Sequence, residues 1–379
     1  MMHHWLKWLE REEWTKEGLP LDFPSQRPFY DLPIFRPYLD EFIISRGLWE
    51  PPSYYGKRFA VCITMDLDSF FTRKEYLRKL VWALRKHEPK MILASVYGLM
   101  RRNGDTDLED YLEVYRKHKV RATFFVPFYL GYSQDPRDPL YSLTQKIAFD
   151  GRKYVLREVL LRIAEEGHEI GLHPSIPAAF DGERLKSEKL GLERMLDMEI
   201  VSLRQHWLMW HPQETPRLQT EAGFLYDSTF GFNRLPGFRA GTSYPFRFYK
   251  DSVLELPLIL QEGTLLKGLS AGALGLSLKR AVELGKTILE RIARVGGVAV
   301  ILVHPSIRGS PESEERLRWL EALLSEAIHL GAVFMTIGEV GRFWQEHYES
   351  LWEEALGQVF QNLPLEQWNV WRFRTDREE

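Results

Sequence analysis

From residue 58 onward, short apolar runs rich in β-branched residues alternate with longer stretches in which apolar positions recur at helical spacing. The apolar runs predict strands at 59–64, 122–126, 169–172, 200–204, 253–257, 298–303 and 332–336. The longer stretches predict helices at 73–87, 155–166, 183–197, 215–222, 277–295 and 312–330. Because strands that alternate with helices form parallel sheets, residues 58–341 are predicted to form one α/β domain whose sheet is either open or closed into a barrel.

The segments on either side of this domain follow other patterns. Residues 1–57 are rich in proline and aromatic residues without sustained periodicity, which predicts an arm laid over the domain surface. Residues 342–379 carry large apolar side chains at roughly helical spacing, which predicts an amphipathic C-terminal helix docked on the domain.

The composition is that of a globular protein, because 379 residues with 44% hydrophobic content can bury a large core. A formal net charge of -3 gives no basic field over the chain, so composition favours neither nucleic acid nor an anionic membrane as the main partner. No membrane span is expected, and charges among the N-terminal tryptophans argue against a signal peptide. Cys62 is expected to be a buried strand thiol in a reducing compartment, which together predicts a cytoplasmic protein.

Polar side chains follow several of the predicted strands directly. Asp66, His173, Arg204, His206 and His304 each come just after an apolar run. Because the C-terminal ends of parallel strands meet at one edge, these side chains are expected to converge although the sequence spreads them over nearly 240 positions. Histidines and aspartates in that arrangement indicate a metal-dependent site.

The acidic pair Asp66 and Asp68 is expected at the end of the first strand, where residues two apart face the same side. One carboxylate can bind a divalent metal while the other removes a proton from the attacking water. A structural alternative is that Asp68 caps the helix that begins near Thr72. His168 precedes its strand, so it is expected at the opposite end in a structural hydrogen bond.

Five segments across residues 58 to about 340 resemble, in order, the motifs of the NodB-homology polysaccharide deacetylases, carbohydrate esterase family 4. Thr64-Met65-Asp66-Leu67-Asp68 is similar to the opening motif in its Asp-x-Asp variant, and the run from Gly167 to His173 matches a later motif almost residue for residue. The resemblance implies a distorted (β/α) barrel of about seven parallel strands with an N-terminal arm and a C-terminal helix. Residues 231–249 resemble a narrower subgroup associated with surface-polysaccharide synthesis.

The resemblance also implies roles for the matching residues. Asp66 takes the place of the general base, and Asp68 and His173 take those of metal ligands. Arg204 is implied to hold Asp66 ionised through a charge-assisted hydrogen bond. The backbone N–H of Trp207 is implied to stabilise the oxyanion.

The general acid implied by the last motif is His304, with Asp227 of the fourth motif expected to orient and charge it. Candidate substrate-binding residues lie in the loops around this edge. They are Tyr226, Arg239, Gly241 and Ser175.

One departure from the family affects the metal site. The family's second ligand histidine stands four residues after the first, and that position holds Pro177 here. His206, two residues beyond Arg204, is predicted to supply the missing ligand; His211 and a metal-free or water-completed site are the alternatives. An Asp/His ligand set suits zinc, with cobalt, nickel or iron also compatible.

The function implied is hydrolytic removal of an acetyl or formyl group from an N-acylated amino sugar or polysaccharide precursor, with a carbohydrate as the partner. Two alternatives stay open. One is a catalytically silent carbohydrate-binding protein that has lost its metal, and the other is an amidase that acts on a non-sugar amide.

Overall fold

The computed structural model describes residues 33–71, 73–87, 89–100, 106–129, 137–139, 141–266 and 274–362. Within these residues one large sheet has the strand order β10-β11-β1-β2-β5-β6-β7-β9-β8, and β12 pairs with β1 beside that path. Its pairs are parallel except for β8 with β9. The strands are β1 (Phe59–Asp66), β2 (Ala122–Pro127), β5 (Glu169–His173), β6 (Ser202–Leu203), β7 (Tyr226–Asp227), β8 (Phe246–Arg247), β9 (Leu254–Glu255), β10 (Leu258–Gln261), β11 (Val298–Val303) and β12 (Ala332–Phe334).

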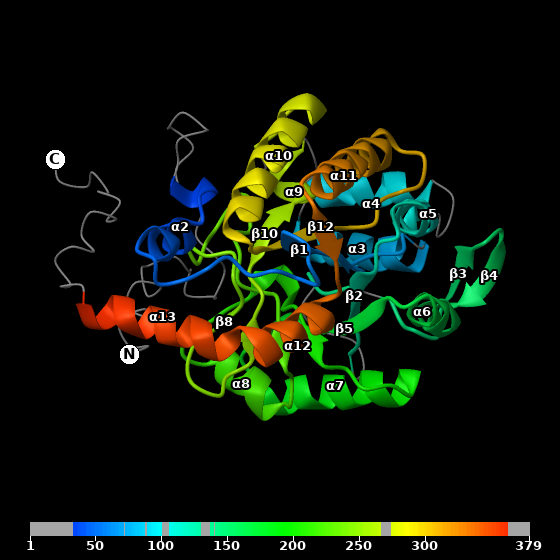
Figure 1. The fold of residues 1–379 in the computed structure, drawn as a ribbon. Coiled ribbons are helices and arrows are strands. Elements are labelled where there is room, and N and C mark those ends of the chain that lie inside the picture. Colours follow the sequence, from blue (N-terminus) through cyan, green and yellow to red (C-terminus); the bar gives the residue numbers. More distant parts are fainter. Residues whose placement is uncertain are drawn as a thin grey trace, which may run out of the picture.

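The sheet curls into a half-barrel with helices around its outside (Figure 1). This confirms the predicted α/β class and the distorted barrel. The distortion lies on one side, because β6, β7, β8 and β9 are only two residues long each. The surrounding helices are α5 (Leu108–His118), α6 (Leu156–Glu165), α7 (Gly182–Leu196), α8 (Thr215–Glu221), α10 (Leu278–Val295) and α11 (Pro311–His329).

Strand β1 shows how the core positions the polar residues. Val61, Ile63 and Met65 belong to the cluster that packs against the outer helices, whereas Ala60 and Cys62 belong to a second cluster on the other face. Because side chains alternate along a strand, the even-numbered face continues toward Asp66. The strand period therefore turns Asp66 to the face opposite the outer helices, and Cys62 is confirmed as a buried thiol.

The described part of the N-terminal arm packs against the C-terminal helices. It contains the 3₁₀ helix η1 (Pro33–Phe35) and α2 (Tyr38–Ser45), while residues 1–32 lie outside the described residues. The ring of Trp49 lies 6.1 Å from that of Trp344 and 5.2 Å from that of Trp352. The predicted terminal helix is two helices, α12 (Ile337–His347) and α13 (Glu349–Asn362), and residues beyond 362 are not described.

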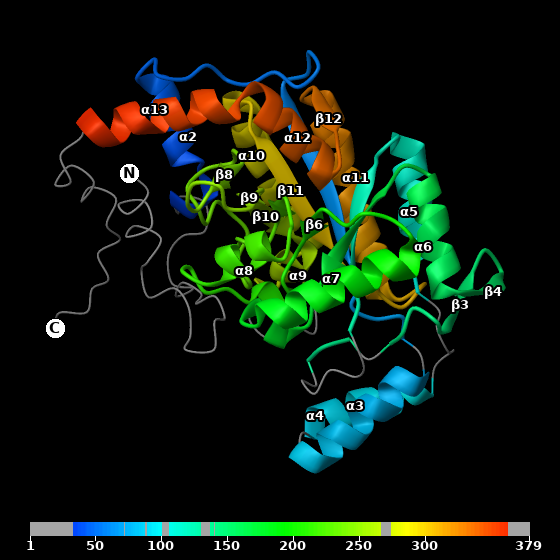
Figure 2. The same cartoon turned by 90° about the horizontal axis from the view of Figure 1, so that it is seen from below.

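The remaining elements connect strands near the carboxyl edge of the sheet or beside it. Helices α3 (Arg73–Lys86) and α4 (Pro89–Leu99) form a hairpin that stands away from the body of the molecule (Figure 2). The other connecting elements are the hairpin β3 (Lys146–Phe149) and β4 (Arg152–Val155), the 3₁₀ helices η2 (Ile176–Ala179) and η3 (His206–Leu208), and α9 (Glu262–Leu265).

None of the described helices combines the length and hydropathy needed to cross a bilayer.

The glycine in the middle of β5 fixes the spacing between neighbouring strands. A Cβ added at Gly171 would lie 2.7 Å from the ring of Phe125 on β2 and 2.7 Å from the hydroxyl of Ser202 on β6. We expect Gly171→Ala to lower the free energy of unfolding by about 1–3 kcal/mol, because overpacking forces neighbours out of their rotamers. Denaturant titration measures this change.

The matched control is Gly263→Ala, because a Cβ added there meets no atom within 4 Å. It should change the free energy of unfolding by less than about 0.5 kcal/mol. Equal stability of the two variants would contradict the close contact at Gly171.

Candidate metal centre and active site

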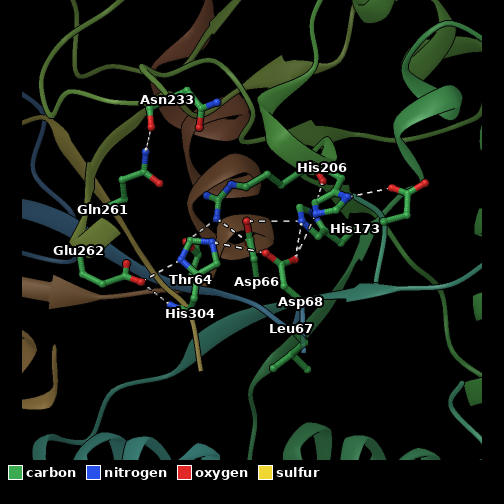
Figure 3. A network of polar contacts seen from close by, with 12 residues as sticks. Thr64, Asp66, Leu67, Asp68, His173, His206, Asn233, Gln261, Glu262 and His304 are labelled. Carbon is green, nitrogen blue, oxygen red and sulfur yellow. Dashed lines mark hydrogen bonds and ion pairs between the residues drawn. The ribbon is translucent and has the colours of Figure 1, made fainter. Parts of the chain in front are cut away.

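The ends of separate strands bring the predicted residues together at one edge of the sheet (Figure 3). Asp66 ends β1 and His173 ends β5. Arg204 directly follows β6, His206 begins η3, and His304 directly follows β11. The convergence predicted from the strand-end rule is therefore present in the fold.

Asp68, His173 and His206 form a group whose ligand atoms all lie within 4.8 Å of one another. Oδ1 of Asp68 is 3.2 Å from Nε2 of His173 and 3.6 Å from Nε2 of His206. Both imidazoles are buried. His206 thus stands beside the other two candidate ligands, where a ligand was predicted to replace the one missing at Pro177.

The hydrogen bond at Nδ1 of each imidazole determines whether its Nε2 atom can bind a metal. Nδ1 of His173 lies 2.6 Å from the carbonyl oxygen of Arg204, and Nδ1 of His206 lies 2.9 Å from Oδ1 of Asp138. Because a carbonyl only accepts, Nδ1 of His173 carries a proton, and in the neutral ring the lone pair is on Nε2. The carboxylate of Asp138 favours the same tautomer for His206. Both Nε2 atoms are therefore available as metal ligands.

Asp68 supplies a direct test of whether these residues fit a cation. Its Oδ1 atom is buried and accepts no hydrogen bond among the described residues. A buried carboxylate oxygen without a donor costs free energy unless a cation compensates it. One orphaned oxygen and two imidazole lone pairs match the ligands that zinc and related divalent metals take in proteins.

Burial and neighbouring charges shift the pKa values of Asp68 and His173 in opposite directions. Burial acts to raise the pKa of Asp68, but His206, His173 and His304 outweigh it and hold that pKa well below its usual range. Burial likewise acts to lower the pKa of His173, and the carboxylates of Asp66 and Asp68 reverse this and raise it. Protons and a metal ion therefore compete for the same imidazoles.

Asp66 is paired with a fully buried guanidinium, as predicted. Nη1 of Arg204 donates to Oδ1 of Asp66 at 3.0 Å and to the hydroxyl of Thr64 at 2.7 Å. Nε and Nη2 of Arg204 donate to the carbonyl and hydroxyl of Ser228 at 2.7 and 2.9 Å. The guanidinium also lies over the ring of Phe125, 4.6 Å from its centroid, so its position leaves Asp66 next to a fixed positive charge.

The carboxylate at His304 is Glu262, not Asp227. Oε1 of Glu262 lies 2.9 Å from Nδ1 of His304 and accepts its backbone N–H at 3.0 Å. Burial acts to lower the pKa of His304, but Glu262, together with Asp68 and Asp66, raises it to about 9. Burial acts to raise the pKa of Glu262, and His304 and Arg316 outweigh it and lower that pKa.

The contact predicted between Asp227 and His304 is wrong because sequence order is not sheet order. His304 follows β11, whose neighbours are β10 and β1, and Glu262 follows β10 directly. Asp227 belongs to β7, on the far side of the sheet order, where its carboxylate accepts from Gln219 at 2.8 Å and from Thr229. Burial raises the pKa of Asp227 to about 6, which fits a core carboxyl group and not a partner of His304.

Three of the four candidate substrate-binding residues make structural contacts, and substrate binding by them stays a prediction. The hydroxyl of Tyr226 donates to Gln345 of α12, because the strand period turns it away from the site. The hydroxyl and N–H of Ser175 both donate to Glu188, which commits them to holding the loop after β5. Gly241 has a φ of +71° and accepts the N–H of Leu39 through its carbonyl, so it forms a turn against α2.

Arg239 is buried among aromatic rings, whereas the side chain of Trp207 is exposed. Arg239 is buried over the rings of Phe230 and Phe232 and donates to the carbonyl of Gly231 at 3.1 Å. Trp207 has a φ of +58°, a left-handed conformation that is strained for a tryptophan, and its side chain is 44% exposed beside His206. Binding of substrate by Arg239 stays a prediction.

Two residues of the site escaped the sequence reasoning. Glu262 directly follows β10, which consists of three apolar residues and Gln261, so the strand-end rule would have found it if that run had been recognised as a strand. Asp138 lies in a connection without strand or helix periodicity, and no sequence signal marks it. The interpretation of His168 was correct in kind: its Nδ1 accepts the N–H of Ala122 at 2.9 Å.

The fold is similar to that of a candidate polysaccharide deacetylase from Mycobacterium smegmatis, with a TM-score of 0.54 and 21% identity over 79% of this chain and 95% of that one. A second candidate polysaccharide deacetylase, from Pseudomonas aeruginosa PAO1, gives a TM-score of 0.49 and 16% identity over 79% and 95% of the two chains. The PuuE allantoinase gives 0.47 and 13%, again over 79% and 95%.

No family model matches the sequence. No curated protein matches it either. The likeness to the Mycobacterium smegmatis protein shows that this chain has the polysaccharide-deacetylase fold, as the motif resemblance implied. The narrower subgroup suggested by residues 231–249 stays a prediction.

The carboxylate behind His206 gives a test of the metal site. Asp138 fixes the tautomer of His206 and also accepts the N–H of Ile176 at 2.9 Å. We expect Asp138→Asn to weaken zinc affinity by about 10- to 100-fold, because the amide no longer enforces the imidazole tautomer that binds metal. Competition with a chromophoric chelator measures the affinity.

The matched control is Asp107→Asn, which changes another buried aspartate, one that accepts the N–H of Ser306 away from the metal ligands. It should bind zinc as the unchanged protein does. Equal zinc affinity of the Asp138 variant and the control would show that His206 is not a ligand oriented by Asp138.

Proposed function

We propose that the site hydrolyses the amide of an N-acylated amino sugar, as in N-deacetylation or deformylation. One observation carries this proposal: the candidate metal ligands lie between an aspartate paired with a buried cation and a histidine paired with a buried carboxylate. Asp66 with Arg204 is the first pair and His304 with Glu262 is the second. Hydrolysis of an amide needs one group that accepts a proton from water and another that donates a proton to the leaving nitrogen.

Asp68, His173 and His206 would hold the metal ion. A divalent metal bound there supplies Lewis-acid chemistry, which polarises the acyl carbonyl and makes water easier to deprotonate at neutral pH.

Asp66 is the proposed general base. The guanidinium of Arg204 donates to Oδ1 of this carboxylate, and the other oxygen, Oδ2, lies 3.7 Å from Nε2 of His173. The carboxylate therefore accepts a proton from the attacking water on the side of the metal ligands.

His304 is the proposed general acid. Glu262 holds the ring through Nδ1, so the remaining nitrogen, Nε2, faces the site at 3.8 Å from Oδ2 of Asp68. The raised pKa keeps His304 protonated at neutral pH. The imidazolium can therefore donate a proton to the leaving amine nitrogen. The backbone N–H of Trp207 is the proposed oxyanion donor.

The substrate class rests on the fold, because the Mycobacterium smegmatis protein is named as a candidate polysaccharide deacetylase. The silent alternative was suggested by the proline at position 177, and a third ligand at His206 supports the enzyme in its place. A screen of acylated amino sugars beside cyclic ureides separates a deacetylase from an amidase on non-sugar amides. Zinc as the metal and a cytoplasmic location are part of the proposal.

Replacement of the base should separate chemistry from metal binding. We expect Asp66→Asn to lower turnover by about 10²- to 10⁴-fold while zinc occupancy stays unchanged, because the amide cannot accept the proton of water. Turnover and elemental analysis of the same preparation measure the two quantities. The paired control is Asp68→Asn, which should lose both turnover and bound zinc. Loss of zinc in the Asp66 variant alone would mean that the base and the metal ligand are exchanged.

The charge of Glu262 should set the alkaline limit of activity. A general acid acts only when protonated, so activity falls as pH rises through the pKa of His304. In Glu262→Gln the attraction that raises this pKa is lost, and we expect the alkaline limb of kcat to move to lower pH. A bound cation lowers the pKa of His304 in both proteins, so the difference between the two profiles is the quantity to compare.

The control for this experiment is Glu255→Gln, because Glu255 is a buried glutamate that accepts the N–H of Phe230 and lies in β9, far from β11 in the sheet order. Its alkaline limb should stay in place. An unmoved limb in Glu262→Gln would remove His304 from the role of general acid.

A further inference from the structure

The hairpin of α3 and α4 stands away from the body of the molecule (Figure 2) and follows β1, the strand that ends at Asp66. Its first helix begins at Arg73, five residues after Asp68. Glu75 in the first turn accepts the hydroxyl of Ser69 at 2.6 Å and the N–H of Phe70 at 3.2 Å. These bonds fix the root of the hairpin to the loop of Asp68.

The two helices contact each other closely and leave apolar side chains exposed on other faces. At the contact, a Cβ on Gly98 would lie 2.1 Å from the ring of Tyr76. The exposed apolar positions recur at spacings of three, four or seven residues, so each helix carries an apolar stripe. The stripes consist of Leu77 (51% exposed), Val81 (48%) and Leu84 (54%) on one helix, and of Leu93 (72%), Val96 (42%) and Met100 (81%) on or directly after the other, where Tyr97 (58%) is exposed next to Val96.

The charge of this segment differs from that of the rest of the chain. Residues 73–100 contain seven lysines and arginines and two glutamates, a formal charge of +5 within a chain of -3. Lys74 and Arg85 are exposed on the same helix as the first stripe. Basic side chains beside an apolar stripe are typical of helices that lie in the interface of an anionic bilayer.

We propose that the α3–α4 hairpin docks the protein on the surface of an anionic lipid bilayer. A second copy of this chain fits the stripes less well, because it would bring two segments of +5 together. Nucleic acid would satisfy the charge but not the apolar stripes. The hairpin lies on the bilayer and does not cross it, since no described helix is suited to spanning.

This docking is independent of the reaction proposed above, but it has a geometric consequence. Because Ser69 and Phe70 tie the hairpin to the loop of Asp68, a bilayer bound to the hairpin lies beside the sheet edge that carries the metal ligands. The site then works next to a lipid surface.

Flotation of the full chain with lipid vesicles tests the proposal. We expect the protein to float with vesicles of equal parts phosphatidylcholine and phosphatidylglycerol and to stay behind with phosphatidylcholine alone. Added salt should release it, because the charge attraction is screened within about 10 Å at 0.1 M ionic strength.

The variants separate the apolar stripes from the basic charge. The combined change Leu84→Ser, Leu93→Ser and Met100→Ser should lower partitioning onto anionic vesicles by at least about tenfold, because the buried apolar area is lost. Lys74→Gln with Arg85→Gln should lower it by about tenfold or more. Circular dichroism and zinc occupancy report whether each variant keeps its fold.

The matched control changes three exposed apolar residues elsewhere: Leu190→Ser, Ile328→Ser and Leu351→Ser, at positions that are 44%, 49% and 54% exposed. It should float as the unchanged chain does. The proposal is overturned by absence of binding to anionic vesicles, by equal loss in hairpin and control variants, by a dimer that the hairpin serines dissociate without any vesicle binding, or by binding of duplex DNA in place of vesicles.

Discussion

The guanidinium of Arg204 is fully buried at the centre of the sheet edge, and the geometry of the site depends on keeping it paired. A buried charge costs several kcal/mol unless hydrogen bonds and an opposite charge compensate it. Arg204 finds these partners on β1, through Thr64 and Asp66, and beyond β7, through Ser228. Its carbonyl oxygen also accepts the Nδ1–H of His173, so one residue positions Asp66, a candidate metal ligand and three parts of the sheet.

Two aspartates two positions apart have different surroundings in this arrangement. Asp66 faces the guanidinium of Arg204, whereas Asp68 faces the imidazoles of His173 and His206, the candidate metal ligands. His304 has the opposite kind of partner, the buried carboxylate of Glu262. In the proposed mechanism, the base and the acid are therefore each paired with a group of opposite charge.

The sequence predicted the strand ends well because a buried parallel strand leaves a continuous apolar run, and the residue after it must lie at the carboxyl edge. This rule brought Asp66, His173 and His206 together correctly. It could not tell which strand neighbours which, and so paired His304 with Asp227 instead of the carboxylate after β10. The contact of Tyr226 with Gln345 of α12 could not be predicted either, since in a two-residue strand the sequence does not show which face is inward.

The net charge of the whole chain hides a local difference. The chain carries -3, yet residues 73–100 carry +5, so the rest of the chain carries -8. Within a Debye length of about 10 Å at 0.1 M ionic strength, a partner meets the local charge and not the average. Because Glu75 bonds Ser69 in the loop of Asp68, the basic hairpin begins next to the candidate metal ligands. The segment after β1 therefore joins the candidate metal site to the proposed docking surface within a few residues of chain.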